Sequence, residues 1–226
     1  MYSTSMAYDP VNSPLYAFLL KGDHYKLPKG QVVHALEDRT QLNLITNGFI
    51  KRYRITNEGD KSIQLIYGPH DIFPMTPVYQ AIYETKVYRG PETYYYESMT
   101  EIEVYSQSIE ALKEKLKEAP ELYHDLLYAA GTRLNSYIMR MEDMSLRTSL
   151  WRVAYTLSSL ADQFGQATSG GTLITLPLTH QDLAALLDLS RETISREVNK
   201  LKERSLISGG KNIIIVDPQK LRDIYR

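Results

Sequence analysis

No cysteine occurs among the 226 residues of this sequence, and this absence excludes disulfides, thiolate-ligated iron–sulfur clusters, zinc knuckles and cysteine nucleophiles. Long apolar runs are lacking too, because charges interrupt every such run well before the roughly 20 residues that a membrane-spanning helix needs. Residues Met1 to Asp9 show neither the basic cluster nor the apolar segment of a secretion signal. We therefore expect a cytoplasmic protein.

A strong charge of either sign is also lacking, since the formal net charge is −1, with 43% hydrophobic and 23% charged residues. This composition is typical of a globular protein, and the length suits two domains. A nucleic-acid-binding protein of this charge must concentrate its basic groups locally. Tyrosine is abundant, with 18 residues, many between Tyr79 and Tyr105. They are interpreted either as strand-forming aromatics on a half-buried sheet or as the lining of a ligand pocket.

Between Gln31 and about Ser106, apolar and polar residues mostly alternate, and turn residues separate the alternating segments. Several short segments of this kind predict an antiparallel β sandwich or barrel that ends near Ile109. The predicted strands are 41–46, 50–56, 62–67 and 100–106, and the predicted turns are 47–48, 57–60 and 68–69.

The remainder of the chain predicts helices. A short amphipathic helix is expected over 109–118 and a further one over 146–164, followed by a polar loop over 165–171. Between the two helices lies a long apolar stripe, whose ~25-residue helix would be ~37 Å long. A small β domain cannot cover a stripe of that length, so a self-associating helix pair is favoured over a helix packed only on its own chain. The expected dimer-interface residues are Leu122, Leu126, Leu134, Ile138 and Met141.

Residues 178–204 contain two capped helices separated by a tight turn at Asp188. Thr179 predicts an N-cap that is paired with Asp182 three residues later, and Ser190 predicts the second N-cap. Apolar side chains at helical spacing give both helices a packing face, and this arrangement predicts a helix-turn-helix. These side chains are Leu183, Leu186, Leu187, Leu189, Ile194, Val198 and Leu201.

The second of these helices also has a polar face, which spans an arc of about 140° at 100° per residue. Arginine can donate two hydrogen bonds to guanine O6 and N7, and glutamate can accept one from cytosine N4. Base reading in the major groove is therefore favoured; the alternative is a solvated surface with an i,i+4 ion pair between Glu192 and Arg196. The polar face comprises Arg191, Glu192, Ser195, Arg196 and Asn199.

Basic residues concentrate in and after this helix. From Arg191 to Arg204 there are five basic and three acidic residues, a local excess of +2 in a chain of net negative charge. Such an excess suits contact with phosphates, which position a helix on DNA without reading its sequence. The basic residues expected near phosphates are Lys200, Lys202, Arg204 and Lys211.

Beyond the helix, residues 206–216 predict a hairpin with a Gly209-Gly210 turn, which is a wing. The sequence here resembles the cyclic-AMP receptor protein and fumarate–nitrate regulator (Crp/Fnr) family of bacterial transcription factors. The similar motifs are Thr-x-Gln-Asp-Leu-Ala, Ser-Arg-Glu-Thr-Ile-Ser-Arg and Leu-Ile-Ser-x-Gly-Lys. The resemblance covers the chain from about Tyr25 onward. It implies an α+β fold with an N-terminal antiparallel β-roll like a cyclic-nucleotide-binding domain (1–118), a dimerisation helix (119–145) and a C-terminal winged helix-turn-helix (146–226).

The resemblance also implies roles for individual residues. Arg191, Glu192 and Arg196 match positions that read bases, which implies half-sites resembling TGTGA in an inverted repeat. Ser195 and Asn199 are expected to contact bases or backbone. The expected phosphate contacts are Thr179, His180, Gln181, Ser190, Lys200 and Lys202.

Two features depart from the family pattern. Asp188 stands where the family often has glycine, but aspartate tolerates the left-handed conformation better than most residues. In the sensor, Pro74-Met75 follows Phe73 where cyclic-nucleotide-binding members have Gly-Glu. No arginine stands at the required place in 91–95, and Glu92 would repel a phosphate. We therefore interpret the cyclic-nucleotide site as lost.

These observations predict a homodimeric, sequence-specific DNA-binding transcription regulator, with RNA polymerase and an unidentified small-molecule effector as further partners. The alternative is a protein-interaction or structural module that keeps the fold without specific DNA binding. An enzyme has no support, because phosphate-loop, metal-ligand and nucleophile-turn motifs are missing. No catalytic residue, metal or cofactor is expected; haem bound through His34 or His70 is the remaining option, against a structural role for these histidines.

Overall fold

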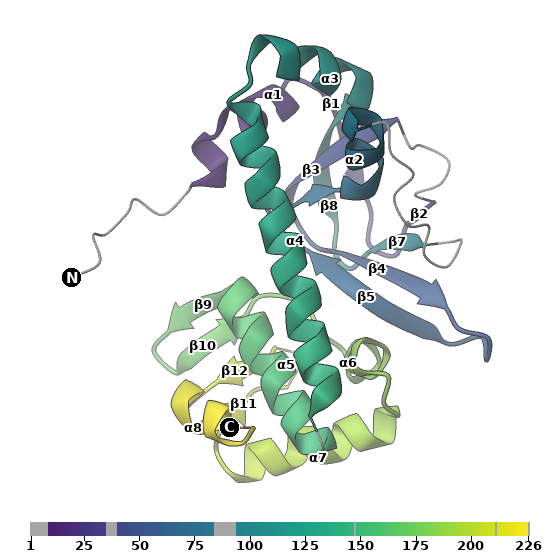
Figure 1. Ribbon diagram of the computed structural model, residues 1–226. Helices are drawn as coiled ribbons and strands as arrows, with labels where there is room; N and C mark the ends of the chain where they lie inside the picture. The colour runs from purple at the N-terminus through teal and green to yellow at the C-terminus, as the bar shows by residue number, and fades with distance from the viewer. Residues whose placement is uncertain (1–8, 35–39, 84–93, 147, 211, 226) are drawn as a thin grey trace. The chain divides into compact units, whose positions relative to one another are not determined.

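The computed structural model describes residues 9–34, 40–83, 94–146, 148–210 and 212–225. They divide into two compact units, which Figure 1 shows with their helices and strands. The first unit comprises Met1–Lys51 and Tyr67–Arg133, and the second comprises Arg52–Ile66 and Leu134–Arg226. No helix among the described residues is both long and apolar enough to cross a membrane.

The N-terminal part is an antiparallel β domain with short helices, as predicted. Its strands form two four-stranded sheets, with the orders β1-β8-β3-β6 and β2-β7-β4-β5. The elements are η1 (Pro10–Asn12), α1 (Pro14–Leu19), β1 (Asp23–Leu27), β2 (Val32–His34), β3 (Gln41–Asn47), β4 (Ile50–Ile55), β5 (Lys61–Tyr67), β6 (Ile72–Phe73), α2 (Met75–Tyr83), β7 (Tyr95–Ser98), β8 (Ile102–Ser108), α3 (Ile109–Glu118) and α4 (Leu122–Ser145).

The turn predicted at Asn47-Gly48 connects β3 to β4. Gly48 has a φ of 85°, which side chains rarely adopt. A Cβ at this position would also lie only 2.3 Å from the carbonyl oxygen of Glu101. Glycine is therefore required here both by the backbone conformation and by the close approach of the segment that precedes β8.

The tyrosine-rich segment does not consist of strands alone. Tyr95, Tyr96 and Tyr105 lie on β7 and β8, as strand-forming aromatics should. Tyr79 instead lies on helix α2, so the interpretation of these residues as strand formers was wrong there. Its ring packs against the core of the first unit, because α2 is amphipathic at helical spacing rather than alternating.

The core of the first unit joins the β domain to the beginning of α4. Leu42 and Leu44 of β3 pack in one cluster with α1, with Leu112 of α3 and with the first turns of α4. From α4, Leu122 and Leu126 enter this cluster with exposures of 1% and 4%. The first turns of α4 are thus part of a core within the chain.

The second unit contains the C-terminal helices and a small sheet of strand order β11-β12-β10-β9. The predicted polar loop over 165–171 is partly wrong, since 165–168 form a strand paired with the next one. All four residues of this strand, 165–168, are exposed, so the sequence has no alternation of apolar and polar residues there that would predict a strand. The elements are α5 (Ser149–Phe164), β9 (Gly165–Thr168), β10 (Gly171–Ile174), α6 (His180–Leu187), α7 (Arg191–Glu203), β11 (Ile207–Ser208), β12 (Ile214–Ile215) and α8 (Pro218–Asp223).

Candidate DNA interface

Helices α6 and α7 form the predicted helix-turn-helix. The Thr179 hydroxyl accepts a hydrogen bond from the Asp182 backbone N–H at 3.0 Å, and the Asp182 carboxylate accepts one from the Thr179 N–H at 3.2 Å. This reciprocal capping box starts α6 at His180. The Ser190 hydroxyl accepts from the Thr193 N–H at 3.1 Å and starts α7 at Arg191. Both predicted N-caps are confirmed.

The side chain of Asp188 holds the turn between the two helices through contacts that a glycine at this position could not make. Asp188 is left-handed, with φ 49° and ψ 50°, as its position in the turn requires. Its carboxylate accepts a hydrogen bond from the Ser62 hydroxyl at 2.7 Å and pairs with Arg140 at 3.0 Å. Arg140 also donates to the carbonyl oxygen of Leu186, near the end of α6. These contacts join segments of the second unit that are 46 to 126 residues apart, and no local sequence signal indicates them.

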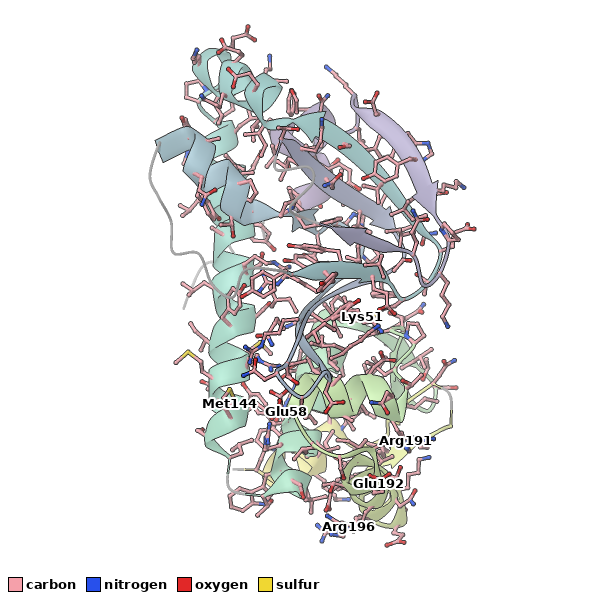
Figure 2. The ribbon with its side chains drawn as sticks, turned by 90° about the vertical axis from the view of Figure 1, so that its right-hand side faces the viewer. Lys51, Glu58, Met144, Arg191, Glu192 and Arg196 are labelled. Atoms are coloured by element: carbon pink, nitrogen blue, oxygen red, sulfur yellow. The ribbon has the colours of Figure 1, made fainter. Side chains whose placement is uncertain are left out.

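Helix α7 separates its apolar and polar sides as predicted. Ile194, Val198 and Leu201 are at most 1% exposed and hold the helix on the unit. The base-reading candidates Arg191, Glu192 and Arg196 are exposed, and Figure 2 shows the three labelled side chains along this helix. Of the other two polar-face residues, Asn199 is exposed and Ser195 is half-buried. The polar face is therefore open to a ligand along most of its length.

Arg196 does not form the alternative ion pair with Glu192. Its Nε atom donates instead to the carboxylate of the adjacent Glu197 at 3.0 Å. Glu197 is only 2% exposed and also pairs with Lys200 at 2.9 Å. The sequence shows this glutamate only as one of three acidic residues between Arg191 and Arg204, and no local signal indicates its burial.

The candidate phosphate contacts lie at the N-terminal ends of α6 and α7 and in the last turn of α7. Thr179, Gln181 and Ser190 are exposed at the beginnings of the two helices, while His180, Lys200 and Lys202 are half-buried. Lys202 has no ion-pair partner among the described residues. Lys211 of the wing lies outside the part of the chain that the structure describes. The N-terminal ends of both helices present backbone N–H groups, which favour anions.

His180 links the two helices. Its Nδ1 atom is hydrogen-bonded to the Ser195 hydroxyl at 2.8 Å, so the first residue of α6 contacts the polar face of α7. Burial, and then the positive charges of Lys202 and Arg191, lower the pKa of His180. The imidazole is therefore held neutral in a positively charged neighbourhood, which is the electrostatic environment of an anion site.

Comparison with known proteins places this geometry in a family. Residues 151–224 match the Crp-like helix-turn-helix domain. The "CRP-like cAMP-activated global transcriptional regulator" of Mycobacterium tuberculosis is 29% identical over 196 residues, covering 86% of this chain and 84% of that protein. Residues 151–224 are therefore a Crp-like helix-turn-helix domain, and most of the chain is similar to regulators of the Crp/Fnr family. The chain is accordingly a DNA-binding transcription regulator, and its relatives are regulators rather than enzymes.

Solved structures of Crp/Fnr proteins have the same fold. A CooA variant from Carboxydothermus hydrogenoformans superposes with a TM-score of 0.74 at 17% identity, covering 100% of this chain and 98% of that one. FixK2 from Bradyrhizobium japonicum gives a TM-score of 0.72 at 17% identity, covering 90% and 97%. The predicted order of β domain, long helix and C-terminal helix-turn-helix is thereby confirmed.

The β domain of the first unit contains a cluster of buried aromatic side chains. The rings of Tyr67, Phe73 and Tyr96 form one cluster with centroids 5.3 to 6.0 Å apart, and each residue is at most 5% exposed. Met75, which was expected to stand in place of a glutamate of cyclic-nucleotide-binding members, is 7% exposed at the start of α2. Glu92 lies outside the described residues.

A separate cavity of about 230 Å³ lies in the first unit, between the N-terminal segment, the turn before β6 and α4. His70, one of the two histidines considered for haem, lines it and is hydrogen-bonded to the Tyr16 hydroxyl at 3.0 Å. Asp71 and Arg133 form an ion pair in its wall. The side chain of His34 lies outside the described part of the chain.

The exposed apolar stripe on α4 differs from the predicted one only in its N-terminal residues. Leu122 and Leu126 are buried in the core of their own chain, so their assignment to a dimer interface was wrong. Leu134, Ile138 and Met141 are 60%, 45% and 71% exposed, as an unpartnered interface requires. The exposed stripe continues to Leu127, which is 71% exposed and seven residues before Leu134. This spacing of seven is the signal that could have identified Leu127.

We predict that DNA binding takes up protons at His180. A phosphate beside the imidazole favours its charged form, whereas burial and the nearby cations disfavour it in the free protein. The pKa of His180 is then higher in the complex than in the free protein, so the complex binds more protons. The affinity for DNA therefore rises as the pH falls through the pKa of His180 in the complex. The rise is at most about tenfold per pH unit for each half-site. Fluorescence anisotropy over about pH 5.5 to 8, the range of histidine titration, measures this slope.

The matched variant for this prediction is His180→Gln, which keeps a polar side chain that cannot titrate. Its affinity should change less with pH than that of the wild type. An equal slope in both proteins would show that His180 is not next to a phosphate.

Proposed function

We propose that this regulator acts as a homodimer that binds an inverted repeat with TGTGA-like half-sites. The observation that carries the proposal is the polar face of α7, whose arginines and glutamate are exposed while its apolar face is buried. Arg191 and Arg196 each donate to a guanine, and Glu192 accepts from a cytosine. Lys202 and the helix N-termini contact phosphates and set the register.

Dimerisation is supported by the exposed stripe of α4. Four large apolar side chains at spacings of seven, four and three residues are typical of a coiled-coil seam: Leu127, Leu134, Ile138 and Met141. Two chains related by a two-fold axis would place their α7 helices about 34 Å apart, in successive major grooves. We retain 119–145 as the dimerisation segment, between the sensor and DNA-binding domains.

The effector we propose is a small molecule other than a cyclic nucleotide. The Mycobacterium tuberculosis relative is named as activated by cAMP. Here Pro74 and Met75 replace the glycine and glutamate of the phosphate cassette, and Met75 is buried among apolar side chains. The cavity lined by His70 and Arg133 offers space for a different small ligand.

The test of the proposed function is the affinity of the wild-type dimer for two duplexes, a TGTGA-type inverted repeat and a scrambled sequence of equal composition. Specific sites of such regulators bind on the order of 10³-fold or more tightly than non-specific DNA at physiological salt. We expect a preference of this order by fluorescence anisotropy. Equal affinity for both duplexes would favour an interaction module that has kept the fold without reading DNA.

A further inference from the structure

The recognition helix carries a buried carboxylate directly behind its base-reading face. Glu197 is 2% exposed, although the side chains of its neighbours Arg196 and Lys200 are 58% and 45% exposed. Carboxylates are seldom buried to this degree unless they are paired, because loss of water penalises the charged form. The position of Glu197 therefore depends on the groups that contact it.

Three donors converge on this carboxylate. Oε1 accepts hydrogen bonds from Arg196 Nε and from the Ser149 hydroxyl, both at 3.0 Å. Oε2 pairs with Lys200 Nζ at 2.9 Å. Ser149 is the first residue of α5, so the carboxylate also lies at the N-terminal end of a helix, where the dipole favours negative charge.

The protonation state of Glu197 follows from these contacts. Burial works to raise its pKa, but the hydrogen bonds from Lys200, Arg196 and Ser149 outweigh burial and hold the pKa below its usual value. Glu197 is therefore ionised at neutral pH. A carboxylate accepts charge-assisted hydrogen bonds, which are about twice as strong as neutral ones.

The contact with Arg196 constrains how that side chain is presented. Glu197 takes only the Nε atom, and neither Nη1 nor Nη2 of Arg196 has a partner among the described residues. These two nitrogens form the end of the guanidinium that can donate two parallel hydrogen bonds to guanine O6 and N7. Arginine otherwise has many rotamers, and ordering such a side chain on binding opposes association.

We propose that Glu197 is a positioning residue for base reading, which holds Arg196 through Nε and leaves its two terminal nitrogens directed at a guanine. The inference rests on the proposed function, because it assumes that Arg196 reads a base. Ser149 of α5 donates a hydrogen bond to the same carboxylate, so the packing of α5 against α7 also sets the orientation of Arg196. Glu197 itself is too buried to contact DNA.

The test uses Glu197→Gln, which is nearly isosteric and removes the charge. Affinities are measured by anisotropy for the TGTGA-type repeat, for copies in which each G·C pair of the half-sites is replaced in turn, and for scrambled DNA. We expect discrimination at one G·C position to fall by about two- to tenfold per half-site, the cost of ordering one long side chain. Affinity for scrambled DNA should stay constant or increase, since a negative charge has been removed.

The matched control is Glu203→Gln, which removes a charge from the exposed end of the same helix. It should tighten binding to all duplexes slightly and leave discrimination unchanged. In an Arg196→Ala background, Glu197→Gln should cause no further loss of discrimination, because the side chain that it positions is gone. Thermal unfolding of each variant checks that it is folded, and Ser149→Ala tests the same carboxylate from α5 if Glu197→Gln does not fold.

Two results would overturn the inference. The first is that Glu197→Gln discriminates between the duplexes as well as Glu203→Gln does. The second is that Glu197→Gln reduces discrimination in the Arg196→Ala background as much as in the wild-type protein. Neither result affects the proposed function, which the preference of the wild-type protein for the TGTGA-type repeat over scrambled DNA tests by itself. If Arg196→Ala loses discrimination and Glu197→Gln does not, Arg196 reads a base but Glu197 does not position it.

Discussion

Replacement of Arg196 by alanine is expected to cost about 1–3 kcal/mol of binding free energy per half-site on the TGTGA-type repeat and to relax the choice of one base pair. The reason is that Arg196 is expected to donate two hydrogen bonds to one guanine, and alanine can donate none from its side chain. Affinity for scrambled DNA should fall much less. Anisotropy titrations with both duplexes, over a range of salt concentrations, separate the two effects.

The matched variant is Lys202→Ala, which removes a cation beside the same helix. Lys202 is expected to contact a phosphate, so its loss should weaken binding to all sequences alike. The slope of log affinity against log salt should fall by about one, because one fewer counterion is released. If Arg196→Ala instead weakens both duplexes equally, Arg196 is a phosphate contact and the base-reading assignment is wrong.

Substitution of Leu134 by glutamate is expected to convert the dimer into a monomer. Leu134 is 60% exposed in the single chain and lies in the middle of the exposed stripe of α4. Two copies of a charged side chain would then face each other across the two-fold axis without partners, which opposes association. Sedimentation at micromolar concentration should show 26.0 kDa for the variant and about twice that mass for the wild type.

Loss of the dimer should also weaken binding to the inverted repeat. Two linked half-site contacts raise the affinity by roughly 10²- to 10⁴-fold over one, so the monomeric variant should lose an effect of that size. Leu20→Glu is the matched control, since Leu20 is 40% exposed outside α4. It should leave both mass and affinity unchanged. A wild-type protein that sediments as a monomer would contradict the dimer and, with it, the palindromic site.

The elements of this fold with local signals could be predicted from sequence. Helix α3 spans the predicted residues 109–118, and the helix-turn-helix follows from caps whose donor and acceptor are three residues apart. Strand β9 had no such signal, because its residues are polar and exposed and its pairing is made by the backbone. Helix α2 was missed because a tyrosine-rich segment suits strand and helix alike.

The candidate site divides in the same way. The polar arc of α7 was predictable because 100° per residue fixes which side chains share a face. The partner of Arg196 was not, since the i,i+4 rule favours Glu192, whereas Glu197 is drawn inward by Ser149 of α5. Ser149 and Glu197 are 48 residues apart, and nothing local to either position indicates the other.

The sequence by itself determined the helix-turn-helix and the polar face of α7, because both depend on periodicity or on contacts within a few residues. The resemblance of its motifs to Crp/Fnr regulators implied the order of the β domain, the long helix and the C-terminal helix-turn-helix. The tertiary structure alone decided which of two adjacent leucines on α4 is buried. Leu126 enters the core that α1 and α3 build, and Leu127 is left exposed. An apolar pattern shows only that a surface must be covered. The element that covers it is set by contacts between residues far apart in the chain.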